Sequence, residues 1–297
     1  MTLSLSQLQS LETLAVTAAK AAGAIINSYR DREVSTLHKA VGDSPASQVV
    51  TEVDHKAQAA ILEILQPTCK AYDLALLTEE SPDDGERLEK QAFWSIDPMD
   101  GTLAFINNTV GFSVSIGLVA RNGTPLIGVV FDPSGHTLYQ AVRGQGAYKN
   151  DAHILIPEPD KNRPLILRTD FSFKQHPWLL QTQNGLQDIA ERLNLNGAEI
   201  RFQVGAVQNA CEILETPNTC YFKYPRPGNS GGSLWDYAAT ACLYNEAGGI
   251  ATDIHGETME LNRPDSTFMN HRGILYAGNS RLAQEIMMLY RKIALPE

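Results

Sequence analysis

The spacing of hydrophobic positions predicts an amphipathic helix at the start of the chain. From Leu5 onward, apolar residues recur at intervals of three and four, after a cap at Ser4 or Ser6. This pattern predicts a helix that ends near Arg30. The polar stretch over residues 36–47 then predicts a loop.

A second helix is expected after this loop. Thr51 or Asp54 would cap it, and Pro67 would end it, because proline lacks the N–H that a helix interior needs. Short apolar runs follow, each bounded by acidic residues, glycine or proline, and such runs are typical of strands. The expected strands cover residues 74–77, 92–96, 112–119 and 126–131, with a further hairpin at 144–146.

The chain changes in composition at residues 157–164, where proline and charged residues cluster. This change predicts a connection between two lobes. The N-terminal lobe, residues 1–160, groups its helices before its strands and is expected to be α+β. The C-terminal lobe, residues 161–297, alternates strands and helices, which indicates an α/β arrangement. Its expected strands are 165–168, 220–224 and 274–277, and its expected helices are 178–193, 206–214, 234–247 and a terminal one from 281.

Composition and charge narrow the range of partners. Of the 297 residues, 43% are hydrophobic and 20% are charged, which is typical of a folded, water-soluble protein. Lys and Arg number 24 against 34 Asp and Glu, for a net charge of −10. Charge attraction to a nucleic-acid polymer or to an anionic membrane is therefore not expected. A phosphate-bearing partner would need a local positive charge, which a metal ion can supply.

Cysteine usage and the N-terminal residues favour a cytoplasmic location. The four cysteines lack the C-x-x-C spacing of a zinc or redox site and are too few for a disulfide framework. Residues 1–10 carry no basic leader, and no apolar run approaches the ~18 residues of a membrane span. Neither secretion nor membrane insertion is expected.

Two aspartates follow the apolar run at 92–96. Asp97 and Asp100 are three residues apart, and Pro98 and Gly101 between and after them favour a sharp turn. Both carboxylates can then face one point, with the Met99 carbonyl between them. Oxygen donors without histidine or cysteine suit a hard cation, Mg²⁺ in particular. Taken alone, the motif is explained equally well as a turn with aspartates at its corners.

Acidic residues at two other element ends favour the metal site over a simple turn. Glu79 and Glu80 follow the expected strand 74–77, and Asp236 lies at the start of the expected helix 234–247. Glu80 is interpreted either as a further acid beside the site or as a solvated strand-end carboxylate.

Four acidic motifs occur in a fixed order along the chain. They are Thr51-Glu52-Val53-Asp54, Glu79-Glu80-Ser81, Asp97-Pro98-Met99-Asp100-Gly101-Thr102 and Trp235-Asp236-Tyr237-Ala238-Ala239, followed by Glu246-Ala247-Gly248-Gly249. In this order they resemble the inositol monophosphatase superfamily of magnesium-dependent, lithium-sensitive phosphomonoesterases. The resemblance extends from the first helix to Asn279. It implies the layered αβαβα sandwich of the inositol monophosphatase and fructose-1,6-bisphosphatase type, usually as a homodimer.

The resemblance also implies a ligand set for two or three Mg²⁺ ions per active site. Glu79, Asp97 and the Met99 carbonyl would hold one ion, and Asp97, Asp100 and Asp236 a second. The N-terminal lobe would thus carry most ligands and the C-terminal lobe Asp236. The implied reaction is in-line attack of a metal-activated water on phosphorus, without a covalent enzyme intermediate.

Catalytic roles follow from the same resemblance. Asp54 and Thr102 are expected to form a pair that orients the attacking water, and Glu79 to act as the base. Gly101 and Thr102 would offer backbone N–H groups to the phosphate, together with the Thr102 hydroxyl. Lys39, in the polar loop, is interpreted either as closing over the phosphate or as a surface lysine.

Substrate specificity is expected to come from the C-terminal lobe, around Gly205 and Ala206 and in the segment before Trp235. Inositol monophosphatases have a glutamate in that segment, whereas residues 221–232 contain no acid. The segment is instead similar to that of 3′(2′),5′-bisphosphate nucleotidases. Lys223 and Arg226 would pair with a second phosphate, and Tyr224 would stack on a base.

Other functions remain open at this stage. The substrate could be inositol 1-phosphate, histidinol phosphate or another sugar phosphate. A non-catalytic metal-binding regulatory protein is an alternative of a different class, although every expected ligand is present. We therefore expect a small-molecule phosphate ester as the partner, with neither a nucleic-acid polymer nor a membrane.

Overall fold

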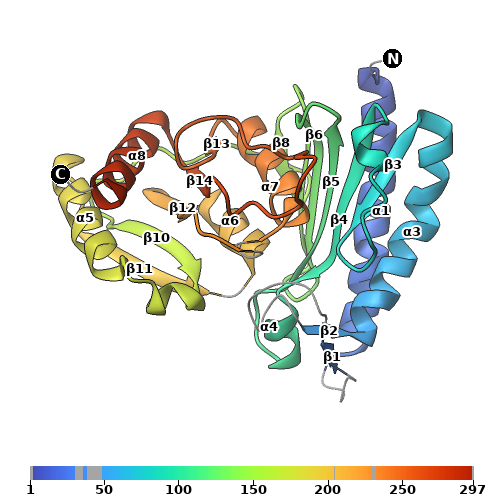
Figure 1. Ribbon diagram of the computed structural model, residues 1–297, viewed down its shortest axis with the longest axis horizontal. Helices are drawn as coiled ribbons and strands as arrows, with labels where there is room; N and C mark the ends of the chain where they lie inside the picture. Colours follow the sequence, from blue (N-terminus) through green and yellow to red (C-terminus); the bar gives the residue numbers. More distant parts are fainter. Residues whose placement is uncertain (1–2, 31–35, 39–48, 204, 229–231, 296–297) are drawn as a thin grey trace.

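The computed structural model describes residues 3–30, 36–38, 49–203, 205–228 and 232–295. Its helices and two large sheets stack in five layers, in the order helix, sheet, helix, sheet, helix (Figure 1). Three hydrophobic clusters fill the spaces between the layers. The layered αβαβα sandwich expected from the sequence is confirmed.

Two helices form the first layer, α1 (Leu5–Ser28) and α3 (Glu52–Tyr72). Ser4 caps α1 with a reciprocal capping box. The buried face of α1 is rich in alanine, and these small side chains allow α1 to pack closely on α3 and on the sheet. Thr51 caps α3, as expected for one of the two candidates.

The prediction that α3 ends near Pro67 is wrong, because the helix continues to Tyr72. Pro67 removes one backbone hydrogen bond, but the turn that contains it is held by other contacts. The Thr68 hydroxyl donates to the Leu65 carbonyl at 2.6 Å, and the Trp94 indole N–H donates to Thr68 Oγ1 at 2.9 Å. Because Trp94 belongs to the sheet below, a tertiary contact sustains the helix beyond the proline.

The second layer is a seven-stranded sheet in the order β3-β4-β5-β6-β7-β8-β9. Only β3 and β4 are parallel, and the other neighbours are antiparallel. The strands are β3 (Leu74–Thr78), β4 (Ala92–Asp100), β5 (Ser113–Ala120), β6 (Pro125–Asp132), β7 (Thr137–Val142), β8 (Ala147–Lys149) and β9 (Ala152–Ile154). The four strands expected from the apolar runs are all present, within a few residues.

A two-stranded ribbon precedes α3, formed by β1 (Thr36–His38) and β2 (Val49–Thr51). The first strand lies inside the stretch expected to be a loop, because it gains its hydrogen bonds from β2 rather than from a local apolar pattern. Lys39 lies outside the described residues.

The middle layer contains α6 (Ala206–Ile213) and α7 (Leu234–Glu246), which lie between the two sheets (Figure 1). Glycines in the first sheet allow α7 to approach closely. A Cβ at Gly128 would lie 2.2 Å from the Ala239 carbonyl oxygen, so no larger residue fits there. This contact brings the start of α7 to the first sheet.

The fourth layer is a five-stranded sheet in the order β11-β10-β12-β14-β13. Its strands are β10 (Leu165–Asp170), β11 (Ala198–Gln203), β12 (Thr219–Lys223), β13 (Ile250–Thr252) and β14 (Ile274–Ala277). Helices α5 (Leu179–Arg192) and α8 (Ser280–Ala294) cover its outer face (Figure 1). Residues 155–164 connect the two sheets, at the place where the composition changes.

Shorter helices complete the fold: η1 (Glu86–Leu88), α4 (Thr102–Ile106) and η2 (Phe171–Gln175). The four cysteines form no disulfide. None of the helices in the described ranges has both the length and the apolar character that crossing a membrane requires.

Candidate metal centre

The end of strand β4 brings two carboxylates to one side of the sheet. Residues three apart in a regular strand face opposite sides, but the register between β4 and β5 shifts between Asp97 and Asp100. The strand runs through Pro98 to Asp100, so of the two residues expected to favour a sharp turn, Gly101 is the one at which the chain turns, with φ of +86°. A Cβ at Gly101 would lie 2.3 Å from the Gly111 carbonyl oxygen.

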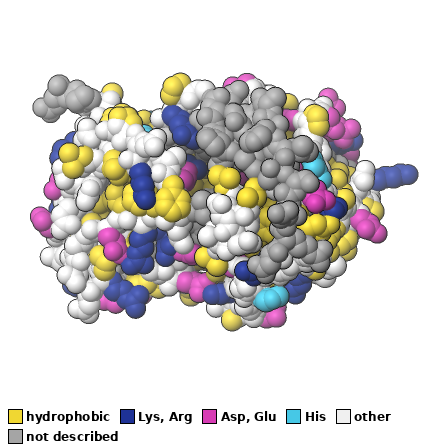
Figure 2. Space-filling view, turned by 90° about the horizontal axis from the view of Figure 1, so that it is seen from below, with side chains coloured by type: hydrophobic (Ala, Val, Ile, Leu, Met, Phe, Trp, Pro, Cys, Tyr) yellow, Lys and Arg dark blue, Asp and Glu magenta, His cyan; other side chains and the backbone are white. Residues whose placement is uncertain are grey.

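Asp236 joins these two aspartates from the start of α7. One carboxylate oxygen from each of Asp97, Asp100 and Asp236 lies within 4.8 Å of the others. The Ser233 backbone N–H donates to Asp236 Oδ2 at 2.7 Å and fixes its orientation. Asp97 is 1% exposed and Asp100 9%. Figure 2 shows acidic side chains scattered over the face that it draws.

Burial and mutual repulsion raise the pKa of every member of this acid cluster, Asp97, Asp100 and Asp236. The pKa of Asp97 is raised well above its usual value, first by burial and then by the charge of Glu79. Burial and the charge of Asp236 raise the pKa of Asp100 to about 8. Burial and Glu79 raise the pKa of Asp236 to about 6. The cluster therefore holds more negative charge than the protein around it compensates.

These donors fit a hard divalent cation. The cluster offers carboxylate oxygens from three element ends, and the pKa shifts place the charge of Glu79 beside it. Within the described residues, no histidine or cysteine belongs to a group of this kind. Oxygen-only sites with concentrated negative charge suit Mg²⁺ better than softer metals. A bound cation would remove the repulsion that raises these pKa values.

Glu79 and Glu80 stand at the end of β3, both partly exposed. The Glu79 backbone N–H donates to the Ile96 carbonyl at 3.0 Å, which continues the parallel pairing of β3 with β4. This pairing puts Glu79 beside Asp97, the residue after Ile96. Two motifs separated in sequence therefore meet because their strands are neighbours.

Asp54 and Thr102 are in contact, as the resemblance implied. Thr102 Oγ1 lies 3.3 Å from Asp54 Oδ1 and 3.2 Å from the Met99 carbonyl oxygen. The second Asp54 oxygen accepts hydrogen bonds from the Thr51 N–H at 2.7 Å and the Thr51 hydroxyl at 2.6 Å. The start of α3 thus holds the start of α4 next to the acid cluster.

Gly205 and Ala206 lie at the start of α6, directly behind Asp100. The N–H groups of Ala206 and Val207 donate to the Asp100 carboxylate at 3.3 and 2.9 Å. At Gly205, φ is +84°, and a Cβ would lie 2.9 Å from Asp100 Oδ2. In this structure the two N–H groups therefore serve to hold a carboxylate in place.

Lys223 places a partly buried positive charge near the acid cluster. Its ammonium is 2.9 Å from Asp170 Oδ2 and 5.9 Å from the ring centroids of Tyr221 and Tyr237. Its charge lowers the pKa of Asp236, opposing the effect of burial. The sequence offered no sign of Asp170, because it meets Lys223 only where the neighbouring parallel strands β10 and β12 end.

The structure does not support base stacking by Tyr224. The residue is 4% exposed, and its hydroxyl lies 3.0 Å from the hydroxyl of Thr182. Its ring packs among Trp178, Phe222 and Tyr290, with centroids 5.2 to 5.7 Å away. Tyr224 is therefore a core residue between the second sheet and its outer helices, and a substrate cannot reach its ring.

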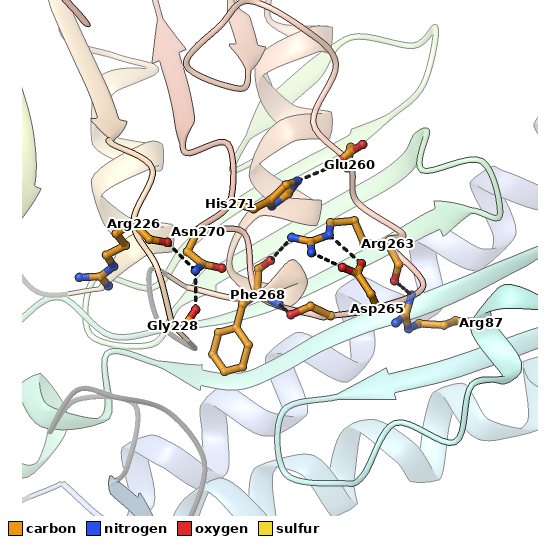
Figure 3. A network of polar contacts seen from close by, with 10 residues as sticks. Arg87, Arg226, Gly228, Glu260, Arg263, Asp265, Phe268, Asn270 and His271 are labelled. Atoms are coloured by element: carbon orange, nitrogen blue, oxygen red, sulfur yellow. Dashed lines mark hydrogen bonds and ion pairs between the residues drawn. The ribbon is translucent and has the colours of Figure 1, made fainter. Parts of the chain in front are cut away.

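Arg226 is held by its backbone rather than by its side chain. Its N–H donates to the Asn270 carbonyl at 3.0 Å, and its own carbonyl accepts from the Asn270 amide at 2.7 Å. Figure 3 shows the exposed guanidinium pointing away from Asn270 and the loop that carries it. The side chain of Arg226 is exposed, and its pairing with a phosphate stays a prediction.

Fold and site together define a layered α/β sandwich protein with a cluster of carboxylate oxygens, able to hold a metal ion, at the ends of β4 and α7. A model of the inositol monophosphatase family matches residues 7–294, and the chain belongs to this family.

Individual relatives agree with this assignment. The chain is 31% identical over 278 residues to Nus factor SuhB of Haemophilus influenzae, covering 92% of this chain and 93% of that protein. It is 27% identical over 247 residues to the inositol-1-monophosphatase of Bacillus subtilis, covering 83% and 85%.

Solved structures share the fold. One is inositol monophosphatase II of Staphylococcus aureus with 2′AMP bound, which has a TM-score of 0.70 and 21% identity and covers 98% of this chain and 97% of that one. The same protein is also known with inositol monophosphate bound, with a TM-score of 0.69 and 22% identity.

Proposed function

We propose that the protein is a Mg²⁺-dependent phosphatase that hydrolyses a small phosphate monoester. The observation that carries this proposal is the meeting of a buried acid cluster with the Asp54–Thr102 pair. Membership of the inositol monophosphatase family supports it. A protein that only bound a metal would need the carboxylates but would have no use for a hydroxyl held next to them.

The proposed ligands are those that the cluster and its neighbours supply. Glu79, Asp97 and the Met99 carbonyl would hold one Mg²⁺, and Asp97, Asp100 and Asp236 would hold another, with two or three ions per site. When bound, these ions supply the positive charge that activates water and stabilises the charge developing at phosphorus.

The chain's own residues then position the reacting water and the phosphate. The Thr102 hydroxyl donates a hydrogen bond to Asp54, so the lone pairs of Thr102 Oγ1 can accept a hydrogen bond from the attacking water. Glu79 accepts the proton that this water loses. The backbone N–H groups of Gly101 and Thr102 bind the phosphate. Glu80 stands next to Glu79 and acts through it.

The preferred substrate that we propose is a 3′(2′),5′-bisphosphate nucleotide. Lys223 is a partly buried cation, and a second phosphate can take the place of Asp170 as its partner. The Staphylococcus aureus protein of the same fold that binds 2′AMP supports a nucleotide substrate. Because the same relative binds inositol monophosphate, inositol 1-phosphate, histidinol phosphate and other sugar phosphates are the competing substrates to be tested.

Phosphate release tests both levels of this proposal. Adenosine 3′,5′-bisphosphate, inositol 1-phosphate, fructose 1,6-bisphosphate and histidinol phosphate are compared with and without Mg²⁺, and with Li⁺ as a competitor. We expect Mg²⁺-dependent release that is fastest with the nucleotide. Negligible turnover of the nucleotide with turnover of another ester would reject the substrate, and no turnover of any ester would reject the enzyme.

Two variants make the assay specific to the acid cluster. Asp97→Asn removes a proposed ligand and should abolish release. Asp253→Asn is the matched control, because Asp253 is equally buried but pairs with Arg272. Full activity of the Asp97→Asn protein would show that the metal assignment is wrong.

A second candidate is a regulatory binding role without catalysis. It is favoured by the name Nus factor SuhB, which relatives of up to 31% identity carry. The absence of a nucleic-acid partner, which the net charge led us to expect, stays a prediction. Under this candidate, the purified protein would bind Mg²⁺ and release no phosphate.

A homodimer and a cytoplasmic location stay predictions, and light scattering tests the first of them.

A further inference from the structure

The loop that follows β13 places an aromatic side chain beside the start of α7. Phe268 forms an antiparallel bridge with Ser233. The Leu234 N–H donates to the Thr267 carbonyl and the Met269 N–H donates to the Gly232 carbonyl, both at 2.9 Å. In this pattern the side chains of the two bridged residues lie on the same side, with Cβ atoms about 4.5–5.5 Å apart.

This position puts Phe268 at the edge of the proposed active site. Ser233 is the residue that caps α7, and its N–H donates to the Asp236 carboxylate at 2.7 Å. Phe268 is therefore paired with Ser233, and Ser233 directly contacts Asp236, a proposed metal ligand. It is partly exposed, unlike the buried ring of Tyr224.

The loop that carries Phe268 is braced on both sides (Figure 3). The Asn270 amide donates to the carbonyls of Arg226 and Gly228. On the other side, Arg263 donates to Asp265 at 2.6 Å and to the Phe268 carbonyl at 3.4 Å. The main chain around the phenylalanine is thus fixed by polar contacts from two directions.

Further contacts anchor this loop to Arg87, which lies in the segment between β3 and β4 of the first sheet. Arg87, which is 2% exposed, donates to the Arg263 carbonyl at 2.7 Å and to Asn262 Oδ1 at 2.6 Å. Met269, next to the phenylalanine, is buried. The Phe268 ring itself points away from these polar contacts, on the side of the loop opposite His271 (Figure 3). A rigid backbone that holds a partly exposed ring is the arrangement of a preorganised binding surface.

We propose that Phe268 is the residue on which the nucleobase of the substrate stacks. The inference rests on the proposed phosphatase function and assigns its specificity to a nucleotide. The scissile phosphate lies at the acid cluster, the second phosphate at Lys223 and the base against the Phe268 ring. Aromatic rings bind bases of any kind through their π-faces, so the contact selects nucleotides over polyol phosphates without selecting one base.

The test compares a substrate that has a base with one that has none. Adenosine 3′,5′-bisphosphate and glycerol 2-phosphate are used with wild type, Phe268→Leu and Phe268→Trp. Loss of one base-stacking contact weakens binding by roughly 10-fold to 100-fold, and we expect this rise in KM for the nucleotide in the leucine variant. The tryptophan variant should restore the wild-type KM. Hydrolysis of glycerol 2-phosphate should be the same in all three proteins.

Phe171→Leu is the matched control. Phe171 is also a surface phenylalanine, 49% exposed, but it stacks on Phe202 with Lys174 above both rings. This variant should leave both substrates unaffected.

Two results would overturn the inference. An equal loss on both substrates in the Phe268→Leu protein would mean that the ring only supports the start of α7. An unchanged KM for the nucleotide would mean that the base lies elsewhere. Calorimetry with adenosine in the presence of Mg²⁺ keeps this separate from catalysis, because adenosine has a base but no phosphate to be repelled or hydrolysed. If wild type hydrolyses glycerol 2-phosphate but shows no adenosine binding that Phe268→Leu weakens, the phosphatase proposal stands and the base-stacking proposal fails. If wild type hydrolyses neither ester but binds adenosine through Phe268, the reverse holds.

Discussion

Replacing Asp97 with asparagine is expected to stabilise the metal-free protein. The Asp97 carboxylate is buried among other acids, and Oδ1 accepts a hydrogen bond from the Met99 N–H at 2.9 Å. Asparagine keeps this acceptor and replaces the second oxygen with an NH₂ group. That group carries no charge and can donate to the neighbouring carboxylates. The substitution therefore removes a repulsion without leaving a buried group unsatisfied.

The separation of the oxygens sets the size of the effect. Two unit charges no more than 4.8 Å apart repel by at least about 3.5 kcal/mol at an effective dielectric constant of ~20. The raised pKa values mean that protons already relieve part of this repulsion at pH 7. The gain on removing one charge is then about 2 kcal/mol, which corresponds to a rise in Tm of about 3 °C in a chain of this size.

Thermal unfolding in EDTA and in excess Mg²⁺ measures this effect. Wild type should gain stability with Mg²⁺, because a ligand that binds only the folded state raises Tm. The Asp97→Asn protein should start from a higher Tm in EDTA and gain little from Mg²⁺.

The same substitution at Asp253 should have the opposite sign. Asp253 is also buried, but it pairs with Arg272 and accepts N–H bonds from His255 and Glu257 at 2.8 and 2.9 Å. Asp253→Asn should therefore lower the Tm. A lower Tm for Asp97→Asn in EDTA would refute the reasoning, since it would mean that the acid cluster is not repulsive in the metal-free protein.

Three further substitutions test other parts of the structure. Thr102→Val removes the hydroxyl that contacts Asp54 and should lower kcat/KM by roughly 10-fold to 100-fold, whereas Thr102→Ser should keep most activity in the phosphate-release assay. In Gly101→Ala the new Cβ would lie 2.3 Å from a backbone oxygen, so the free energy of unfolding in urea should fall by about 3 kcal/mol or more. Gly85 has a similar φ but open space around it, so Gly85→Ala should lower the free energy of unfolding by only about 1 kcal/mol. Tyr224→Phe loses one buried hydrogen bond and should lower stability by about 1 kcal/mol while KM for the nucleotide stays unchanged; a raised KM would restore a substrate role for this ring.

Much of the fold was predictable from local patterns in the sequence. The alanine-rich helical periodicity after Leu5 and the apolar runs that became β3 to β6 depend on residues that are close together in the chain. The residues of the acid cluster were also identifiable, because each follows or begins an element with a clear pattern. Their order along the chain carried the resemblance to the family.

Only the tertiary structure decided how these elements are completed and how the site is built. Helix α3 passes Pro67 because Trp94 in the sheet below supports the next turn. Asp97 and Asp100 share a side because β4 shifts its register against β5.

Substrate contacts depended on tertiary structure even more. Lys223 and Tyr224 are adjacent at the end of β12, so their side chains point to opposite faces of the sheet. The Tyr224 ring enters the core, and the Lys223 ammonium faces Asp170. Phe268 reaches the start of α7 through a bridge between segments 35 residues apart. Such contacts join residues that are distant in the chain, and a pattern confined to neighbouring positions contains no record of them.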